Sequence, residues 1–437
     1  MRMIRTEAEL ARFLGILKVR AAAADPQVVS AVSGIIAGIR KNGNRSLRNY
    51  TRRFDRHNAS SLRISVAEIR RYAAMASPSV VAALKAAAVR IRRFHRMQAE
   101  KSWMFREKEA LLGQVIRPLA RVGVYVPGGK AAYPSTVLMN VIPAQIAGVR
   151  EIAVCVPTPG NEINPSVMAA LLILGVEEVY RIGGAQAVAA MAFGTETIRP
   201  VDKIVGPGNI FVATAKRMVF GTVDIDMIAG PSEILVIADR TAEPAFAAAD
   251  ILGQAEHDEL ASSVLITDSA RFAQETEREI AEQLRRLKRK ATAAASLKKY
   301  GAVILVKDLR DAARISNLIA PEHLELMTAQ PDKLLPLIEH AGAIFLGHWT
   351  PEALGDYAAG PNHTLPTGGT ARFSSPLGVY DFCKRSSLVG FTQKGFGKLA
   401  RVVETVADAE GLEAHAHSVR VRRKAAGNRT RKGRTTQ

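Results

Sequence analysis

The 437-residue sequence predicts an α/β protein with two parallel sheets, a helical N-terminal segment and a small C-terminal unit. Between residues 122 and 346, short apolar runs of about five residues alternate with segments of helical length. This alternation is typical of parallel strands that helices cover on both faces. A chain of this length is expected to form about two to four domains.

The order of the expected elements follows from local patterns. Residues 25–100 are predicted to be helical, because Ala, Leu, Ile and Arg recur at helical spacing in 27–41 and in 78–99. Strands are expected near 122–126, 152–156, 179–182, 203–205, 234–238, 264–267, 303–306 and 343–346. Helices are expected between them at 135–149, 165–174, 184–193, 209–220, 243–257 and 308–319. The first four strands are expected to form one sheet and the last four another, and the pattern weakens after Phe373.

The composition is that of an ordinary globular protein, with 48% apolar and 23% charged residues. No apolar run is long enough to span a bilayer, and the N-terminus has no apolar region of signal-peptide length. Cys155 and Cys383 provide no disulfide framework. We expect both to be buried thiols and the protein to be cytoplasmic.

The net charge of +19 is concentrated at the two ends of the chain. Residues 1–100 hold 20 basic and 6 acidic side chains, residues 420–437 hold 8 basic and no acidic ones, and the rest is close to neutral. This distribution argues against specific nucleic-acid binding by the central part. The tail 422–437 is expected to be disordered and solvated, with weak binding to polyanions as the alternative.

Four segments place a histidine beside a carboxylate or carboxamide at the edge of an apolar stretch: Gln254–Asp258, Pro321–His323, Gly355–His363 and Glu410–His415. Imidazole, carboxylate and other oxygen donors are the ligands of a zinc-type ion. An adjacent Glu–His pair supplies acid–base groups near neutral pH. The four segments together therefore indicate a metal-assisted enzyme.

Each segment alone also has a structural interpretation. Gln254 and His257 share a helix face and can bind one ion, or they form an ordinary polar helix end. Glu322 and His323 can both enter a cleft from a turn, or they begin a helix after Pro321.

The two remaining segments have structural alternatives as well. The long Gly- and Pro-rich loop with Asp356 and His363 is either part of a site or a structural turn. Taken alone, Glu410 and His415 are typical of ordinary surface residues near a chain end.

Three glycine-rich turns each follow a predicted strand and precede a predicted helix: Pro127–Gly129, Gly183–Gln186 and Gly206–Asn209. Backbone N–H groups at such helix starts accept phosphate. None of the turns matches the G-x-G-x-x-G fingerprint. Their common place at the carboxyl ends of strands of one sheet nevertheless indicates a nucleotide site.

Taken together, these motifs resemble the histidinol dehydrogenase family, in order and at family spacing over residues 1–421. The resemblance is carried by Tyr125–Lys130, Pro134–Met139, Gly183–Ala187, Asp202–Asn209, Asp226–Glu233, Gln254–Asp258, Ala320–Glu325, Asn362–Gly369 and Glu410–His415. It implies oxidation of L-histidinol through L-histidinal to L-histidine with two NAD⁺, the last step of histidine biosynthesis. It also implies one Zn²⁺ per subunit.

The resemblance also implies a role for individual residues. The zinc ligands would be Gln254, His257, Asp356 and His415, which also lie against the substrate. Further substrate contacts would be Ser232, His323, His363 and Glu410, and the NAD contacts would be Tyr125, Gln186 and Asn209. We expect His323 to remove the hydroxyl proton and Glu322 to activate the water that adds to the aldehyde.

The domain organisation implied by the resemblance is an NAD-binding domain, 125–232, inserted into a larger catalytic domain of 21–124 and 233–377. Both are expected to be incomplete Rossmann-like sheets. A helical segment, 1–20, precedes them, and a C-terminal unit, 378–421, follows. In this family the C-terminal unit reaches the partner of an intertwined homodimer, so that Glu410 and His415 would serve the other subunit.

Three alternatives remain open at this point. The first is a zinc dehydrogenase for another amino alcohol, and the second is a zinc hydrolase, since a metal with Glu and His also suits water attack. The third is a nucleic-acid-binding protein, which rests on the terminal charge alone. No membrane partner is expected.

Overall fold

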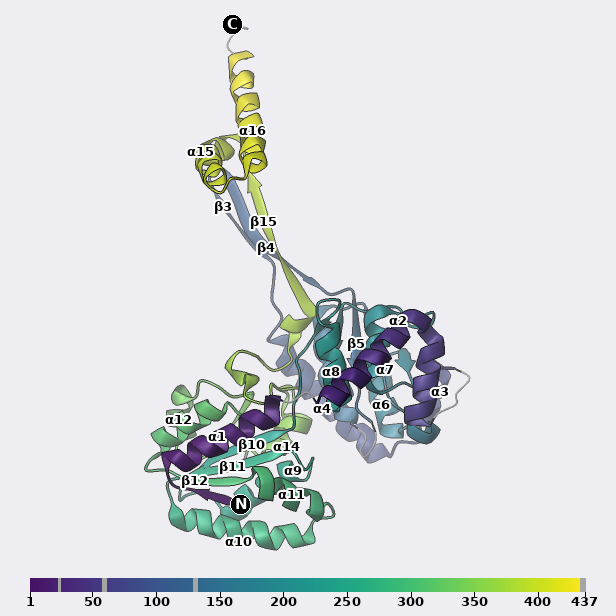
Figure 1. Cartoon of the computed structure of the whole chain (residues 1–437), viewed down its shortest axis with the longest axis vertical. Coiled ribbons are helices and arrows are strands. Elements are labelled where there is room, and N and C mark those ends of the chain that lie inside the picture. Colours follow the sequence, from purple (N-terminus) through teal and green to yellow (C-terminus); the bar gives the residue numbers. More distant parts are fainter. Residues whose placement is uncertain (23–24, 57–60, 129–132, 433–437) are drawn as a thin grey trace. The chain divides into compact units, whose positions relative to one another are not determined.

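The computed structural model describes residues 1–22, 25–56, 61–128 and 133–432, and the chain divides into two compact units. The first unit consists of Met1–Ala99 and Leu119–Phe382, and the second of Glu100–Pro118 and Cys383–Gln437 (Figure 1). The mixed α/β fold with two mainly parallel sheets is confirmed.

One sheet of the first unit, sheet B, has the strand order β2-β7-β6-β5-β8-β9. Its strands are β2 (Arg63–Ile64), β5 (Arg121–Tyr125), β6 (Glu151–Cys155), β7 (Glu178–Tyr180), β8 (Lys203–Val205) and β9 (Asp224–Ile225). All pairs are parallel except β2 with β7. The helices that connect them are α5 (Pro134–Ala147), α6 (Pro165–Ile173), α7 (Gly184–Phe193) and α8 (Ile210–Val219).

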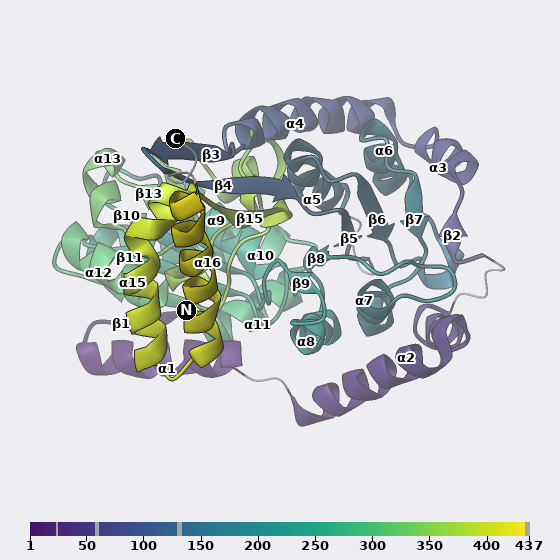
Figure 2. The ribbon, with the colours of Figure 1, turned by 90° about the horizontal axis from the view of Figure 1, so that it is seen from above.

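Three N-terminal helices also pack on sheet B. They are α2 (Pro26–Asp55), α3 (Val66–Ala73) and α4 (Pro78–Arg96). α2 packs with α7 and α8 on one face, and α3 and α4 pack with α6 and α5 on the other (Figure 2). The apolar stripes of these helices complete the core of sheet B, and the expected grouping of 21–124 with 233–377 in one domain stays a prediction.

The second sheet, sheet A, is entirely parallel, with the order β1-β12-β11-β10-β13-β14. Its strands are β1 (Arg2–Ile4), β10 (Glu233–Ala238), β11 (Ser262–Thr267), β12 (Ala302–Leu305), β13 (His323–Met327) and β14 (Ala343–Leu346). Its longer helices are α1 (Glu7–Ala22), α9 (Pro244–Ala255), α10 (Ala270–Arg286), α11 (Lys290–Tyr300) and α12 (Leu309–Ile319). The shorter segments are α13 (Pro331–Leu334), α14 (Glu352–Leu354), a π-helical turn (Gly355–Ala359) and 3₁₀ turns at Pro159–Asn161, Leu335–Leu337, Thr370–Arg372 and Val379–Phe382.

Alternation along β10 explains why helices cover both faces of sheet A. Ile234 and Val236 join the core under α9, α10 and α11, whereas Leu235 and Ile237 join the core under α1 and α12. The segment 1–20 was expected to be helical, but Arg2–Ile4 forms the edge strand β1, with Ile4 buried, before α1 begins.

The second unit is a three-stranded antiparallel sheet followed by two helices. Its elements are β3 (Trp103–Glu107), β4 (Ala110–Pro118), β15 (Cys383–Phe391), α15 (Gln393–Ala409) and α16 (Glu413–Lys432). Figures 1 and 2 both show α15 beside α16. The predicted C-terminal unit, 378–421, does not include β3 and β4. β4 pairs with β15, which lies about 270 residues later in the sequence.

The tail was expected to be disordered from Arg422, but α16 continues to Lys432. Ion pairs from Arg420 to Asp408 and from Arg423 to Glu404 hold this helix to α15. Residues 433–437 lie outside the described part. Among the described residues, no single helix is long and apolar enough to cross a membrane, although the bent pair α3–α4 meets the same test of length and composition.

A buried ion pair supports the turn that follows β8. Lys216 of α8 pairs with Asp226, and both side chains are almost fully buried. The Lys216 ammonium also donates to the carbonyl oxygen of Gly206 at 2.9 Å, and Asp226 accepts the Gly206 N–H at 2.7 Å. Gly206 itself has φ +112°, and a Cβ there would lie 2.1 Å from the Tyr125 carbonyl oxygen. The turn is therefore held from both sides.

Replacing Lys216 by Met should lower the free energy of unfolding by about 3–5 kcal/mol, because Asp226 would be left as an unpaired buried charge. Arg217→Met, at the exposed neighbouring position, should change it by less than about 0.5 kcal/mol. Urea denaturation of the three proteins measures both effects. Equal midpoints for the two variants would contradict this assignment.

Candidate functional site

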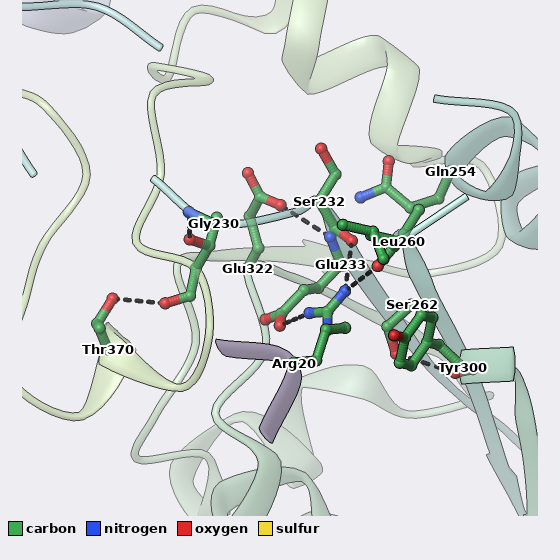
Figure 3. Close-up of polar contacts among 12 residues, drawn as sticks. Arg20, Gly230, Ser232, Glu233, Gln254, Leu260, Ser262, Tyr300, Glu322 and Thr370 are labelled. Carbon is green, nitrogen blue, oxygen red and sulfur yellow. Dashed lines mark hydrogen bonds and ion pairs between the residues drawn. The ribbon is translucent and has the colours of Figure 1, made fainter. Parts of the chain in front are cut away.

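The candidate site lies at the amino ends of two neighbouring strands of sheet A. Ser232 precedes β10, and His323, the first residue of β13, pairs in register with Ile234. α9 returns to the same edge of the sheet and brings Gln254 in its last turn (Figure 3).

The local backbone explains why Glu322 and His323 point into this site. α12 ends at Ile319, and Ala320 then adopts a left-handed conformation with φ 52° before Pro321. This break directs the chain into β13 and excludes a helix start at Pro321. Glu322 and His323 are both buried, with exposed fractions of 7% and 3%.

The backbone of one residue, Glu233, orients both side chains through the two peptide groups that flank its Cα. The Glu233 N–H donates to Glu322 Oε2 at 2.9 Å, and His323 Nδ1 donates to the Glu233 carbonyl oxygen at 2.9 Å. The proton on Nδ1 leaves Nε2 as the nitrogen with a free lone pair. Gln254 Nε2 lies 3.3 Å from the same Nδ1 and is a neighbour only, since that nitrogen already serves as a donor.

Acidic side chains surround the imidazole of His323. Nε2 lies 3.5 Å from Asp356 Oδ1, and Nδ1 lies 3.7 Å from carboxylate oxygens of both Glu322 and Glu352. Ligand atoms of His323, Glu352 and Asp356 lie within 4.8 Å of one another, so they could hold a metal ion. His323 Nε2 and Gln254 Oε1 are buried and have no hydrogen-bond partner. These unpaired acceptors fit a bound cation.

The pKa values reflect burial and this excess of negative charge. Burial raises the pKa of Glu322 to about 8 and that of Glu352 to about 7. Burial lowers the pKa of His323, but the carboxylates of Glu352, Glu322 and Asp356 together raise it well above its ordinary value. Burial tends to raise the pKa of Asp356, and His323 brings it below its ordinary value. The cluster therefore favours a positive charge at this point, whether imidazolium or metal.

Two further predicted site histidines of the first unit, His257 and His363, lie on the segments that carry Gln254 and Asp356. His257 is exposed and follows the end of α9, where its N–H donates to the Gln254 carbonyl oxygen at 3.2 Å. His363 Nδ1 donates to the Asp356 carbonyl oxygen at 3.1 Å, and its Nε2 lies 3.4 Å from Thr136 Oγ1. Through His363, the long loop thus connects Asp356 with α5, a helix that packs on sheet B.

Glu410 and His415 belong to the second unit. Glu410 is the C-cap of α15, His415 lies in the first turn of α16, and both side chains are exposed. Their part in the site stays a prediction.

The three expected NAD contacts lie at the carboxyl edge of sheet B. Tyr125 ends β5, and its hydroxyl accepts the Gly184 N–H at 3.1 Å. Gln186 is buried in the first turn of α7 with Nε2 unpaired. Asn209 caps α8 and accepts from the N–H groups of Phe211 and Val212. The glycine-rich turns do follow β5, β7 and β8, although Gly129 and Lys130 lie outside the described residues.

The two edges present opposite helix ends. α5, α7 and α8 begin at the carboxyl edge of sheet B, where their N-termini favour an anion such as a pyrophosphate. α9 and α12 end at the amino edge of sheet A, where their C-termini favour a cation. The helix ends alone therefore favour negative charge at one edge and positive charge at the other.

The sequence analysis missed several polar residues at these edges. Glu352 lies four residues before Asp356, a helical spacing that could have indicated it. Glu233 is the last residue of the motif Asp226–Glu233, and no role was predicted for it. Arg20 pairs with Glu233 from 213 positions away and carries no local signal. Asp55, at the end of α2, accepts the Gly183 N–H.

Comparisons with known proteins agree along nearly the whole chain. The family profile of histidinol dehydrogenase matches residues 18–423. Histidinol dehydrogenase of Geobacter sulfurreducens is 56% identical over 402 residues, which cover 91% of this chain and 94% of that protein. That of Syntrophotalea carbinolica is 53% identical over 414 residues, or 94% of this chain and 96% of that protein. The crystal structure of histidinol dehydrogenase from Elizabethkingia anophelis matches with a TM-score of 0.92 and 37% identity, covering 98% of this chain and 99% of that one.

Asp55→Asn should stabilise the protein in a pH-dependent way. Burial raises the pKa of Asp55 from 3.8 to about 6, so ionisation of this carboxyl penalises the folded state. The penalty is absent below the ordinary pKa, grows as the pH rises through this window and is complete above the folded pKa. The gain in free energy of unfolding over wild type, from urea denaturation at several pH values, should follow the same course. A gain independent of pH would contradict it.

Proposed function

The chain belongs to the histidinol dehydrogenase family, oxidoreductases of histidine biosynthesis, and on that premise we propose that it oxidises L-histidinol through L-histidinal to L-histidine with zinc and two NAD⁺. The observation that carries the proposal is the meeting of Glu322, His323, Gln254 and Asp356, from three separate segments, around one buried imidazole.

His323 is the proposed proton acceptor. Its Nδ1 is committed to the Glu233 carbonyl oxygen, so Nε2 is the nitrogen that can take the hydroxyl proton of the substrate. In the second oxidation, the same nitrogen can accept a proton from the hydrated aldehyde.

Glu322 is proposed to activate the water that adds to the aldehyde. Its Oε2 is held by the Glu233 N–H at 2.9 Å, which leaves Oε1 to accept a proton from water. Because the carboxylate is buried beside His323, the two groups can exchange a proton within one enclosed site.

We propose Gln254, His257 and Asp356 of one subunit, with His415, as the zinc ligands. The unpaired Oε1 of Gln254 and the surplus of carboxylates support a cation here. Asp356 also belongs, with His323 and Glu352, to a group whose ligand atoms lie within 4.8 Å of one another. Bound zinc would supply a centre that holds the imidazole and amino groups of the substrate against the reacting groups. Ser232, His363 and Glu410 are the proposed further substrate contacts.

NAD⁺ is proposed to bind at the carboxyl edge of sheet B, against Tyr125, Gln186 and Asn209, and to accept the hydride in each step. The helix N-termini at this edge and the unpaired buried amide of Gln186 support the proposal. The domain that binds NAD would be 125–232, joined by α2, α3 and α4 on its two faces.

A homodimer with shared sites is supported by the apolar surface of the second unit. Among its described residues, the buried apolar side chains are those of Ala400, Ala407 and Ala416. Eleven larger ones are at least 43% exposed, and others such as Leu112 and Phe396 are partly buried. The exposed ones are Trp103, Met104, Phe105, Val389, Phe391, Leu399, Val402, Val403, Val406, Leu412 and Val421. A surface of this kind marks a protein interface, and we propose that a second copy covers it and receives Glu410 and His415 in its site.

The proposed location is the cytoplasm. Both cysteines are free, Cys155 buried and Cys383 partly exposed, unlike the two buried thiols that were expected. We propose no membrane partner and no specific nucleic-acid partner.

His323→Ala tests the assignment of the proton acceptor. Its turnover, followed as NADH formation with L-histidinol and zinc-loaded protein, should fall by about 10²–10⁴-fold. His340→Ala, at a histidine of the first unit that lies beside Glu339, should leave turnover unchanged. Wild-type turnover in His323→Ala would refute the role of His323, and absence of NADH from the wild-type enzyme would refute the proposed function.

Shared sites predict complementation between two inactive variants. His323→Ala and His415→Ala homodimers should each have little activity. If His415 serves the partner's site, a mixed dimer contains one site with both histidines intact and one with neither. Unfolding and refolding the two variants together should then restore activity, up to half the wild-type turnover per mixed dimer. Should the mixture stay inactive while mixed dimers form, His415 would act within its own subunit.

A further inference from the structure

A buried ion pair lies behind the proposed catalytic residues. Arg20 of α1 pairs with Glu233 at the start of β10, and the side chains are 1% and 9% exposed. The same guanidinium donates to the carbonyl oxygens of Leu260, at 2.6 Å, and Ser232, at 3.4 Å (Figure 3). Arg20 thereby ties the N-terminal helix to the starts of β10 and β11.

Glu233 occupies a central position at this edge. Its N–H holds Glu322 and its carbonyl oxygen holds His323. Three residues earlier in the same segment, the Gly230 N–H donates to Thr367 Oγ1 at 2.5 Å, which ties this segment to the loop that carries His363. A displacement of the Glu233 backbone would therefore disturb both proposed catalytic side chains, because the two peptide groups that flank its Cα each hold one of them.

Stability alone does not account for this pair. Removing two charges from water costs about as much as their attraction returns, so a buried ion pair is often replaceable by apolar residues without loss of stability. What the pair does provide is orientation, because the planar guanidinium directs several donors at fixed angles. Three acceptors around Arg20, two of them backbone carbonyls, use that geometry.

We propose that Arg20 and Glu233 are positioning residues: their ion pair holds the Glu233 backbone, with the peptide groups on both sides of its Cα, in the place at which Glu322 and His323 are both aligned for the reaction. This inference rests on the proposed function. It assigns a role in turnover to α1, a helix that contributes no group to the proposed reaction itself.

The test compares kcat, KM for L-histidinol, zinc content and melting temperature in zinc-loaded full-length protein. The variants are Arg20→Met, Glu233→Met and the double variant, with Arg12→Met, at an exposed site on the same helix, as the matched control. Arg20→Met leaves a buried carboxylate unpaired and is expected to lower the melting temperature. The double variant removes both charges, so it should melt near wild type and retain zinc.

In the double variant, kcat should fall by about 10–100-fold, the usual effect of losing a residue that orients a catalytic or metal-binding group. KM should change by less than about threefold, because the substrate contacts are not altered. Arg12→Met should match wild type in all four measurements.

A stable double variant with wild-type kcat would overturn the proposal and leave the pair a purely structural one. A fall in kcat accompanied by an equal loss of bound zinc would overturn it too, because the pair would then act on the metal site. Failure of the proposed function is a separate result, since wild-type protein would then form no NADH from L-histidinol.

Discussion

The candidate site depends on the backbone of Glu233. Its N–H donates to Glu322 and its carbonyl oxygen accepts from His323, the two side chains that would perform the proton transfers. Both bonds arise because β10 and β13 are parallel neighbours whose amino ends coincide, with Ile234 in register with His323. The register of one strand pair therefore sets which imidazole nitrogen is left free and where the carboxylate points. Arg20 fixes the side chain of the same residue.

The two sheets differ in which helix ends lie at the edge where a site is predicted. In sheet B the glycine-rich turns lie at the carboxyl edge, where helices begin and anions are favoured. In sheet A the site lies at the opposite, amino edge, where α9 and α12 end and the partial negative charge of their carbonyls favours a cation. The acidic side chains of Glu352 and Asp356 strengthen that preference. This difference between the edges is what the proposed binding of NAD⁺ at sheet B and of zinc at sheet A would use.

Local sequence was sufficient for the fold class and most strands, whereas the chemistry assigned to the site residues stays a prediction. Apolar runs between glycine and proline signals indicated both sheets, and residues such as Gln254 and Asp356 stood out because polar donors are unusual at the ends of apolar segments. Elements whose placement depends on contacts between distant parts of the sequence were not predictable. β1, the placement of α2 to α4 on sheet B, and the joining of β4 with β15 require knowledge of the folded core. Arg20 belongs to the same class, since an arginine on an amphipathic helix is ordinarily exposed.

The most direct test of the account is the number of NADH molecules formed per L-histidinol consumed, with purified zinc-loaded protein and excess NAD⁺. The account predicts two NADH, with L-histidine as the product, because one site with an aligned imidazole and carboxylate would carry out both oxidations before release. One NADH with free L-histidinal in solution would contradict it, since Glu322 would then have no water to activate and the site would be that of a simple alcohol dehydrogenase.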